Sequence, residues 1–337
     1  MPTGRPIPTT RTGWRKRQND GLSNAGGTVT AAAAPSENGE TGRAHVAMLG
    51  FVFLVSTSFP LGHAITHALD PAVLTALRFC IAAAIFAAIA TVKRQWVLPK
   101  LSRLPVYLLI ALLLDIFFVT MFEALRLTSA LNAGAVFTLL PAFTALAGLA
   151  LLGQRISRRQ VVCLGVGAAG ALLVLFGDDL TRLARLEFGP GERIYLFGVA
   201  AYAFYAPLMR LLNRGEPLEI FNFWILTAGA AMLLVYGRAE LAATDWSSVS
   251  PQVLIGIAYL AVFPTATSFF CATYASLRLP AGPVMAYTYL LPSFVLLETV
   301  AIGAPWPGAW TLAGVAVTAA ATFVLQRDGR NTKPRAA

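Results

Sequence analysis

Charged side chains are scarce in this chain. Asp, Glu, Lys and Arg make up only 12% of its 337 residues, whereas hydrophobic residues make up 57%. Soluble domains carry about 25% charged residues. A deficit of this size, together with the high apolar content, argues against a soluble globular protein and indicates an integral membrane protein.

Cysteine and histidine are equally rare, with three of each. Cys80, Cys163 and Cys271 fall in different apolar segments, and no CxxC or Cys/His cluster occurs, so we expect buried thiols and no metal site. HExxH, GxSxG and Walker motifs are absent from the sequence. We therefore expect no enzyme activity, no cofactor and no nucleic-acid partner, and any ATP drive would need another chain.

Long apolar runs, in contrast, fill the chain after residue 44. A helix that crosses a bilayer needs about 20 predominantly apolar residues. Runs of about this length occur at 45–66, 71–92, 105–125, 129–152, 159–177, 193–212, 218–237, 252–276, 281–303 and 306–326. They predict an all-α integral membrane protein with ten transmembrane helices and leave no room for a soluble catalytic domain.

Residues 1–43 have a different composition. "RPIPTTRTGWRKRQND" is basic, "GGTVTAAAAPSENGETG" is small and polar, and neither can bury enough apolar surface to fold. The segment lacks the apolar core of a signal peptide. We interpret it as a disordered basic cytoplasmic tail near anionic lipid, with an organelle transit peptide as the alternative. A second cytoplasmic tail is expected at 327–337.

Lys and Arg concentrate in alternate loops. They are frequent before the first run, in the second, fourth, sixth and eighth connections, and in the C-terminal tail, whereas the other connections are poorer in them or balanced by acids. Because cytoplasmic loops are enriched in Lys and Arg, the pattern predicts both termini on the cytoplasmic side of the cell (inner) membrane. Labelling from outside should then reach sites near Asp178 but not near Arg158.

One sequence motif occurs twice. "DIFFVTMFEALRL" at 115–127 resembles "TSFFCATYASLRL" at 267–279, and each is followed by an apolar run ending in "LLP", at 135–141 and 286–292. Earlier in each half, "SFPLGHAITHALDP" parallels "YAPLMRLLNRGEP". The copies lie five predicted helices apart, and because five is odd they must cross the membrane in opposite directions. This predicts a 5+5 inverted-topology repeat, with halves at 45–177 and 193–326 and a substrate site at the midplane between them.

The same residues resemble a known family. "SFPLGHAITHALDPAVLTALRF" and "EALRLTSALNAGAVFTLLPAFTALAGLALLGQRIS" are similar to the first and the third-to-fourth helix regions of EamA-type members of the drug/metabolite transporter superfamily. The resemblance implies ten helices and a central cavity lined mainly by helices 1, 3, 4, 6, 8 and 9. The chain departs from the family in having Gln154 where Glu is usual, with Pro305 at the matching place, so no role is assigned to that acid.

Asp115 is the leading candidate for a functional group. It lies near the middle of the third run, where a lone Asp costs about 2.5–3.5 kcal/mol on insertion scales, so it should face a cavity or a partner. Its counterpart in the second copy is Thr267. We expect a substrate or proton cavity here, and the alternative is a protonated carboxyl that serves only to pack helices.

Further candidates are less specific. Arg78 in the second run is a further candidate for the cavity: it is expected to contact the substrate, to extend outward, or to pair with an acid such as Asp115 or Glu123. Glu298 is expected to face the cavity or to form a structural ion pair. Aromatic side chains are expected to line the cavity, or to pack at the membrane interface: Tyr202, Tyr205, Trp224, Tyr259 and Tyr287.

Pro141 and Pro292 close the two "LLP" runs and are expected to kink their helices at matched points. Small residues in "CLGVGAAGALL" and "LAGVAVTAAA" indicate close helix packing, which includes the option of a homodimer face. The function expected from these features is a secondary transporter, in the export direction, that moves a small organic metabolite or drug-like molecule across the lipid bilayer by alternating access, with proton coupling as an option. A uniporter or channel-like protein is the alternative.

Overall fold

A computed structural model describes residues 37–153, 157–177, 181, 188–212, 216–276, 278–279, 284 and 286–331, and this part of the chain contains helices and no strands. The helices of the first half are α1 (Glu37–Ser56), α2 (Ser58–Ile65), α3 (Pro71–Val92), η1 (Leu101–Arg103), α4 (Leu104–Leu125), α5 (Ala130–Phe137), α6 (Leu140–Leu152) and α7 (Arg158–Phe176). Those of the second half are α9 (Pro190–Ala203), α10 (Tyr205–Leu212), α11 (Leu218–Tyr236), α12 (Arg238–Ala243), α13 (Pro251–Leu260), η2 (Ala261–Thr267), α14 (Ser268–Ser276), η3 (Tyr287–Leu290), α16 (Leu291–Ala301) and α17 (Ala309–Asn331).

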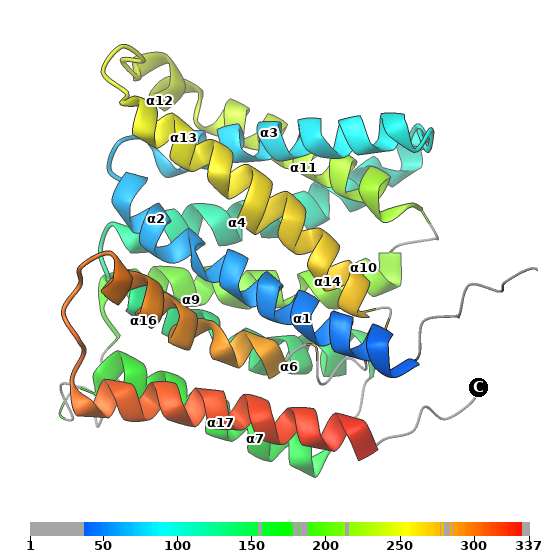
Figure 1. Cartoon of the computed structure of the whole chain (residues 1–337). Helices are drawn as coiled ribbons and strands as arrows, with labels where there is room; N and C mark the ends of the chain where they lie inside the picture. Colours follow the sequence, from blue (N-terminus) through cyan, green and yellow to red (C-terminus); the bar gives the residue numbers. More distant parts are fainter. Residues whose placement is uncertain are drawn as a thin grey trace, which may run out of the picture.

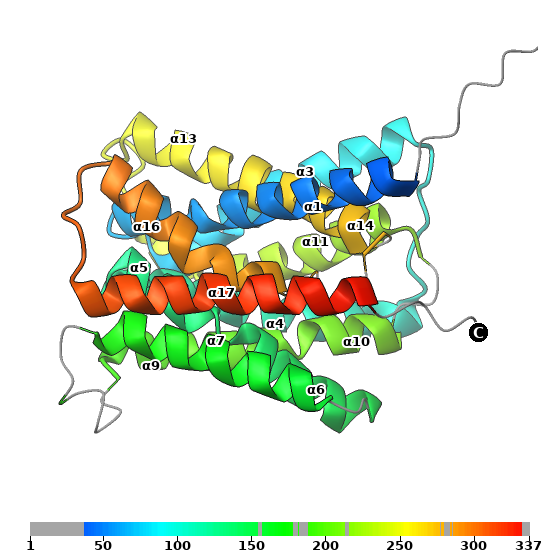
Figure 2. The ribbon, with the colours of Figure 1, turned by 60° about the horizontal axis from the view of Figure 1, so that its bottom comes forward.

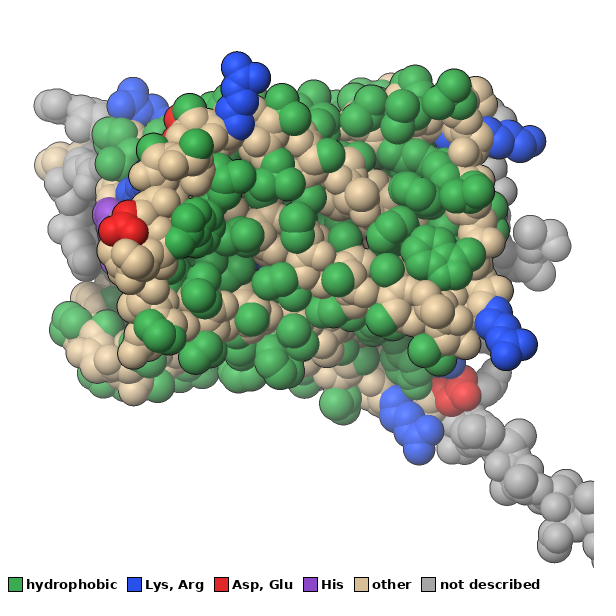
Figure 3. Space-filling model, turned by 90° about the horizontal axis from the view of Figure 1, so that it is seen from above, with side chains coloured by type: hydrophobic (Ala, Val, Ile, Leu, Met, Phe, Trp, Pro, Cys, Tyr) green, Lys and Arg blue, Asp and Glu red, His purple; other side chains and the backbone are tan. Residues whose placement is uncertain are grey.

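The long helices run roughly side by side in one bundle, and the start of α1 and the end of α17 lie at the same end of it (Figures 1 and 2). On the face seen in Figure 3, most charged side chains lie towards the two ends, with a mainly apolar surface between them. Seven helical stretches of the described chain are long and apolar enough to cross a membrane, and Tyr287–Ala301 and Ala309–Phe323 are shorter apolar helices. The predicted all-helical membrane architecture is confirmed, whereas the count of ten spans stays a prediction.

Helix starts follow local sequence signals. The Asp70 carboxylate accepts from the backbone N–H groups of Ala72 and Val73, and Pro71 occupies the first turn of α3, where a missing N–H costs nothing. Ser157 and Gln160 form a reciprocal capping box at α7. Gly153 ends α6 in the left-handed region, at φ 62°, which glycine adopts without strain. These signals set the starts of α3 and α7 and the end of α6.

Two helix boundaries differ from those expected. Helix α1 begins at Glu37, inside the segment 1–43 that was interpreted as a disordered tail, and α17 continues to Asn331, beyond the expected end at 326. Apolar runs mark only the membrane-embedded part of a helix, and polar residues with adequate helix propensity extend it into water. Residues 1–36 and 332–337 of the two predicted tails lie outside the described residues, as does Asp178.

Helices are interrupted at the two "LLP" runs. Thr138 and Leu139 form a turn between α5 and α6, and η3 precedes α16, with Pro141 and Pro292 in the first turn of the helix that follows. The residues preceding those helices have nearly equal backbone angles: φ −78°, ψ −12° at Leu139 and φ −79°, ψ −10° at Leu290. The two prolines therefore stand at breaks of similar local geometry.

The small residues of α7 and α17 pack against each other (Figure 1). A Cβ atom at Gly314 would lie 2.7 Å from the Val174 nitrogen and 2.8 Å from the Gly170 carbonyl oxygen. Backbone atoms on facing helices meet at this distance only when glycine leaves room for them. The predicted role of these runs in close packing is therefore met within one chain, and a homodimer face stays a prediction.

Gly314→Ala should separate α7 from α17 and destabilise the protein by about 1–3 kcal/mol, because the backbone atoms it meets cannot turn aside as a side chain could. Thermal unfolding of the purified protein in detergent measures the effect. Gly165→Ala is the matched control on α7, since a Cβ there has no atom within 4 Å. Equal melting temperatures for the two variants would contradict the packing argument.

Candidate functional site

A cavity of about 300 Å³ lies inside the bundle. The first half of the chain contributes Met48, Phe51, Val55, Ser58, Phe59, Arg78, Leu114, Phe117, Phe118, Met121, Phe137, Leu140 and Thr144. The second half contributes Tyr202, Tyr205, Ala206, Leu226, Pro264, Thr265, Ser268, Phe269, Ala272, Val284 and Thr288. Its size is at the lower end of the range for small-molecule sites, and both halves form its walls.

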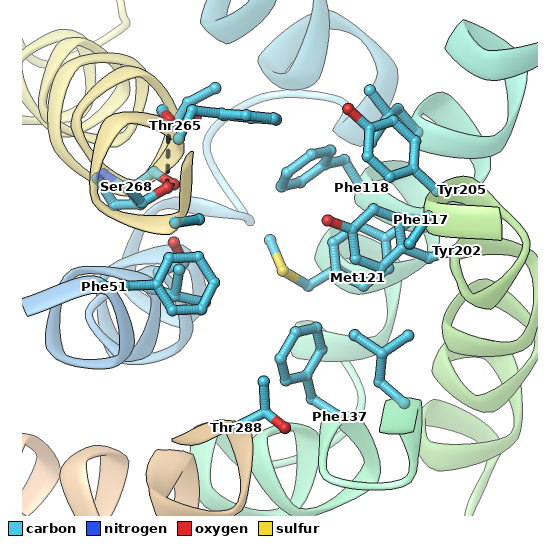
Figure 4. A pocket seen from close by; sticks show the side chains of 18 of the residues that line it. Phe51, Phe117, Phe118, Met121, Phe137, Tyr202, Tyr205, Thr265, Ser268 and Thr288 are labelled. Carbon is cyan, nitrogen blue, oxygen red and sulfur yellow. Dashed lines mark hydrogen bonds between the residues drawn. The ribbon is translucent and has the colours of Figure 1, made fainter. Parts of the chain in front are cut away.

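One wall of the cavity is aromatic. The Phe117 and Tyr202 rings stack with centroids 4.5 Å apart, and the Tyr202 and Tyr205 rings stack at 5.3 Å. Figure 4 shows these three side chains on one side of the space and Thr265 and Ser268 on the other. The cavity thus offers a flat apolar surface opposite a polar one.

Arg78 is the most unusual side chain of the site. It is only 1% exposed, its Nε donates to Thr265 Oγ1 at 2.8 Å, and its guanidinium carbon lies 4.3 Å from the centre of the Phe118 ring. Its Nη1 is buried without a hydrogen-bond partner among the described residues. Of the described residues that line the cavity, Arg78 is the only one with a charged side chain.

Of the alternatives for Arg78, outward extension and an ion pair with an acid are both wrong. The side chain is enclosed in the bundle, and no acid of the described chain lies within ion-pair distance of it. Glu123, one of the two acids considered, instead lies 3.5 Å from Arg126. A hydroxyl brought in from the second half of the chain takes the place of the expected carboxylate, which sequence proximity could not indicate.

Thr265 is positioned by a π-helical turn. Residues Ala261–Thr267 form this turn around Pro264, which has no N–H to continue an α-helical ladder. The hydroxyl groups of Thr265 and Thr267 donate to the carbonyls of Leu260 and Val262, each at 2.9 Å. Backbone groups freed inside a membrane need such partners. The turn aims Thr265 at Arg78, while Thr267 serves the backbone and does not line the cavity.

Asp115 is the twelfth of the 22 residues of α4 and is 5% exposed. It is not among the residues that line the cavity, although Leu114, Phe117 and Phe118 are. A Cβ at Gly229 of α11 would lie 2.6 Å from its Oδ1, so the carboxyl group is directed against that helix. Neither carboxyl oxygen has a hydrogen-bond partner among the described residues. The structure thus places an isolated titratable group beside the cavity wall.

The other sequence-predicted residues divide into two groups. Tyr202 and Tyr205 line the cavity together with Arg78. Tyr259, Tyr287 and Glu298 instead link elements around it: the Tyr259 hydroxyl donates to Thr57, Tyr287 OH lies 2.7 Å from His45 Nδ1, and Glu298 Oε1 lies 2.5 Å from Ser56 Oγ. Trp224 lines a separate pocket between α4 and α11 and donates to the Val97 carbonyl.

The profile of the EamA-like transporter family matches this chain twice, over residues 42–176 and 190–327. The chain belongs to the EamA-like transporter family. The family consists of transporters, so the protein is a multi-pass membrane transporter of small solutes.

Individual relatives agree with this assignment. The chain is 23% identical over 264 residues to the uncharacterized transporter YyaM of Bacillus subtilis (strain 168), an alignment that covers 77% of this chain and 86% of YyaM. A protein of known crystal structure is similar with a TM-score of 0.63 and 22% identity, over 86% of this chain and 98% of the other. That likeness shows the shared fold.

Several cavity residues of this EamA-like transporter escaped the sequence analysis. Phe117 and Phe118 lie within the first copy of the repeated motif, Ser268 lies within the second, and Thr265 lies two residues before the second copy begins. The signal that could have found Thr265 and Ser268 is the helix-breaking Pro264, which changes the face that each following residue presents. Nothing in a uniformly apolar run distinguishes the phenylalanines that face the cavity from those that face lipid.

Proposed function

We propose that this EamA-like protein is a secondary transporter that exports a small organic solute by alternating access. The observation that carries the proposal is the cavity whose walls come from both matched halves of the chain. A site between two halves opens to either side when one half moves relative to the other. The export direction rests on the family resemblance.

An inverted 5+5 repeat is the architecture that we propose for this movement. Supporting it are the two profile matches and the nearly equal backbone angles two residues before Pro141 and Pro292. The interrupted elements also meet: α5 packs on α16, and a Cβ at Gly134 would lie 3.2 Å from Val295 and 3.3 Å from Leu291. Helix breaks at matched places on facing elements suit a gate.

Proton coupling through Asp115 is the second element of the proposal. A carboxyl group in the middle of a spanning helix, without an ion-pair partner, is of the kind that binds and releases protons in transporters. Its place beside residues that line the cavity would let its protonation affect the shape of the site. Uniport without proton coupling is the alternative.

Both termini are proposed to be cytoplasmic. The start of α1 and the end of α17 share one end of the bundle, and the loop between α16 and α17 lies at the other (Figure 1). In a variant whose Cys80, Cys163 and Cys271 are replaced, Ala304→Cys should react with an impermeant maleimide added to intact cells, and Arg158→Cys should react only after lysis. The reverse pattern would invert the proposed orientation.

Reconstituted vesicles test the transport function. Uptake of a radiolabelled solute that binds the purified protein should saturate with concentration, and solute loaded inside the vesicles should accelerate uptake from outside. Saturation requires a binding site, and the acceleration requires that this site be exposed to one side at a time. Linear, non-saturating flux would instead indicate a channel, and no protein-dependent flux would refute transport of that solute.

A further inference from the structure

We propose, resting on the transport function above, that the substrate is a small organic monoanion with one carboxylate and a flat or apolar body, and that Arg78 binds the carboxylate. This assigns a ligand class to the cavity from its charge, its hydrogen-bonding groups and its wall composition.

The first argument is that the guanidinium group has no counterion and an incomplete set of hydrogen bonds among the described residues. A buried charge without a partner costs several kcal/mol, so structural arginines inside proteins are normally paired. Arg126 shows the ordinary case: its Nε and Nη2 donate to the Thr66 and Leu69 carbonyls, each at 2.9 Å, and Glu123 lies close by. Arg78 has a neutral hydroxyl as its only hydrogen-bond partner among the described residues. A ligand that enters the cavity can supply the missing negative charge.

The second argument is orientation. Thr265 accepts a hydrogen bond from Nε, and the guanidinium carbon lies over the Phe118 ring, so these two contacts hold the guanidinium group in place. The buried Nη1 remains without a partner. Planar N–H groups held in this way match the two oxygens of a carboxylate better than they match a single neutral acceptor.

The third argument is the charge count. The described lining holds one cationic side chain and no acid, so it can neutralise one negative charge and offers no counterion to an organic cation. A dianion would keep an uncompensated charge in a site of low dielectric, which is costly. The cavity of about 300 Å³ further limits the ligand to a small molecule.

The fourth argument concerns the rest of the ligand. The stacked Phe117, Tyr202 and Tyr205 rings form the wall opposite Thr265 (Figure 4). A ring or short apolar chain attached to the carboxylate would lie on this wall while the carboxylate reaches Arg78. Aromatic surfaces of this kind favour offset stacking with a flat partner.

Binding to the purified full-length protein tests the inference, with phenylacetate and hexanoate as anions, phenylacetamide as the neutral isostere, phenethylammonium as the cation and phenyl phosphate as the dianion. Calorimetry and ligand-dependent melting temperatures should show binding of at least one monoanion. The amide, the ammonium compound and the phosphate should bind at least about 10-fold more weakly, since a hydrogen-bonded charge pair contributes that much or more.

Arg78→Met should weaken binding of the monoanion about 10- to 100-fold and remove its preference over the amide. Arg78→Lys keeps the charge but not the planar set of N–H groups, and it should retain part of the preference for the anion. Arg126→Met removes an arginine outside the cavity and should retain the full preference for the anion.

Three results would overturn the inference: equal binding of phenylacetate and phenylacetamide by the wild type, retention of the anion preference in a folded Arg78→Met variant, or no binding of either monoanion. If Arg78→Met does not fold, the wild-type selectivity and Arg78→Lys decide. Vesicle flux separates this test from the proposed function. Anion binding without saturable flux would refute transport and retain the ligand class. Saturable flux of a neutral or cationic probe would retain transport and refute the ligand class.

Discussion

Transport driven by a proton gradient should be lost in Asp115→Asn, while the variant still folds and inserts. The amide has the size of the carboxyl group but cannot bind and release a proton. Because a neutral amide costs less to bury than a carboxylate, the stability of the variant should equal or exceed that of the wild type. Vesicles with an imposed pH gradient measure the coupling, and thermal unfolding in detergent measures the stability.

The control for Asp115→Asn lies on the same helix. Glu123, near the end of α4, is 41% exposed in its side chain and lies beside Arg126, so Glu123→Gln removes a carboxylate without touching the bundle centre. It should keep gradient-driven flux. If Asp115 serves only to pack helices against Gly229, Asp115→Asn will also transport normally, and full pH-driven flux in that variant would refute the coupling role.

Thr265→Val should destabilise the protein and weaken the cavity site. The substitution keeps the shape of the side chain but removes the oxygen that accepts from Arg78 Nε at 2.8 Å and donates to the Leu260 carbonyl. Loss of a hydrogen bond to a buried charged group costs about 1.5–3 kcal/mol. Thermal or denaturant unfolding in detergent measures the loss, and binding of a cavity ligand should weaken with it.

Two further variants isolate the role of the Arg78 contact. Thr265→Ser keeps the hydroxyl group and should retain most of the stability. Thr267→Val, in the same π-helical turn, removes a hydroxyl that donates to the Val262 carbonyl, a neutral group, and should cost only about 0.5–1.5 kcal/mol. Equal losses in Thr265→Val and Thr267→Val would mean that the contact with Arg78 contributes nothing to stability.

The repeated motif shows which features of the structure could be predicted from the sequence and which could not. The matched "LLP" runs predicted kinks at Pro141 and Pro292. In the structure each proline lies in the first turn of an α-helix, directly after a turn that is not α-helical, because the effect of proline on the backbone is local. The same reasoning paired Asp115 with Thr267 as two cavity groups. Neither lines the cavity, since a π-helical turn and the packing of α4 on α11 decide which way each points.

By itself, the sequence determined the class of protein, the helical segments, the duplication and the family. These follow from composition, run length and local backbone signals, which act over a few residues to a few turns. Only the tertiary structure decided that Arg78 is held by Thr265, that Asp115 faces Gly229, and that Tyr202 stacks on both Phe117 and Tyr205 in the cavity. In a membrane helix nearly every side chain is apolar, so the sequence carries no periodic contrast between the lipid-facing and cavity-facing sides. Which residues meet is then fixed by helix packing between distant segments.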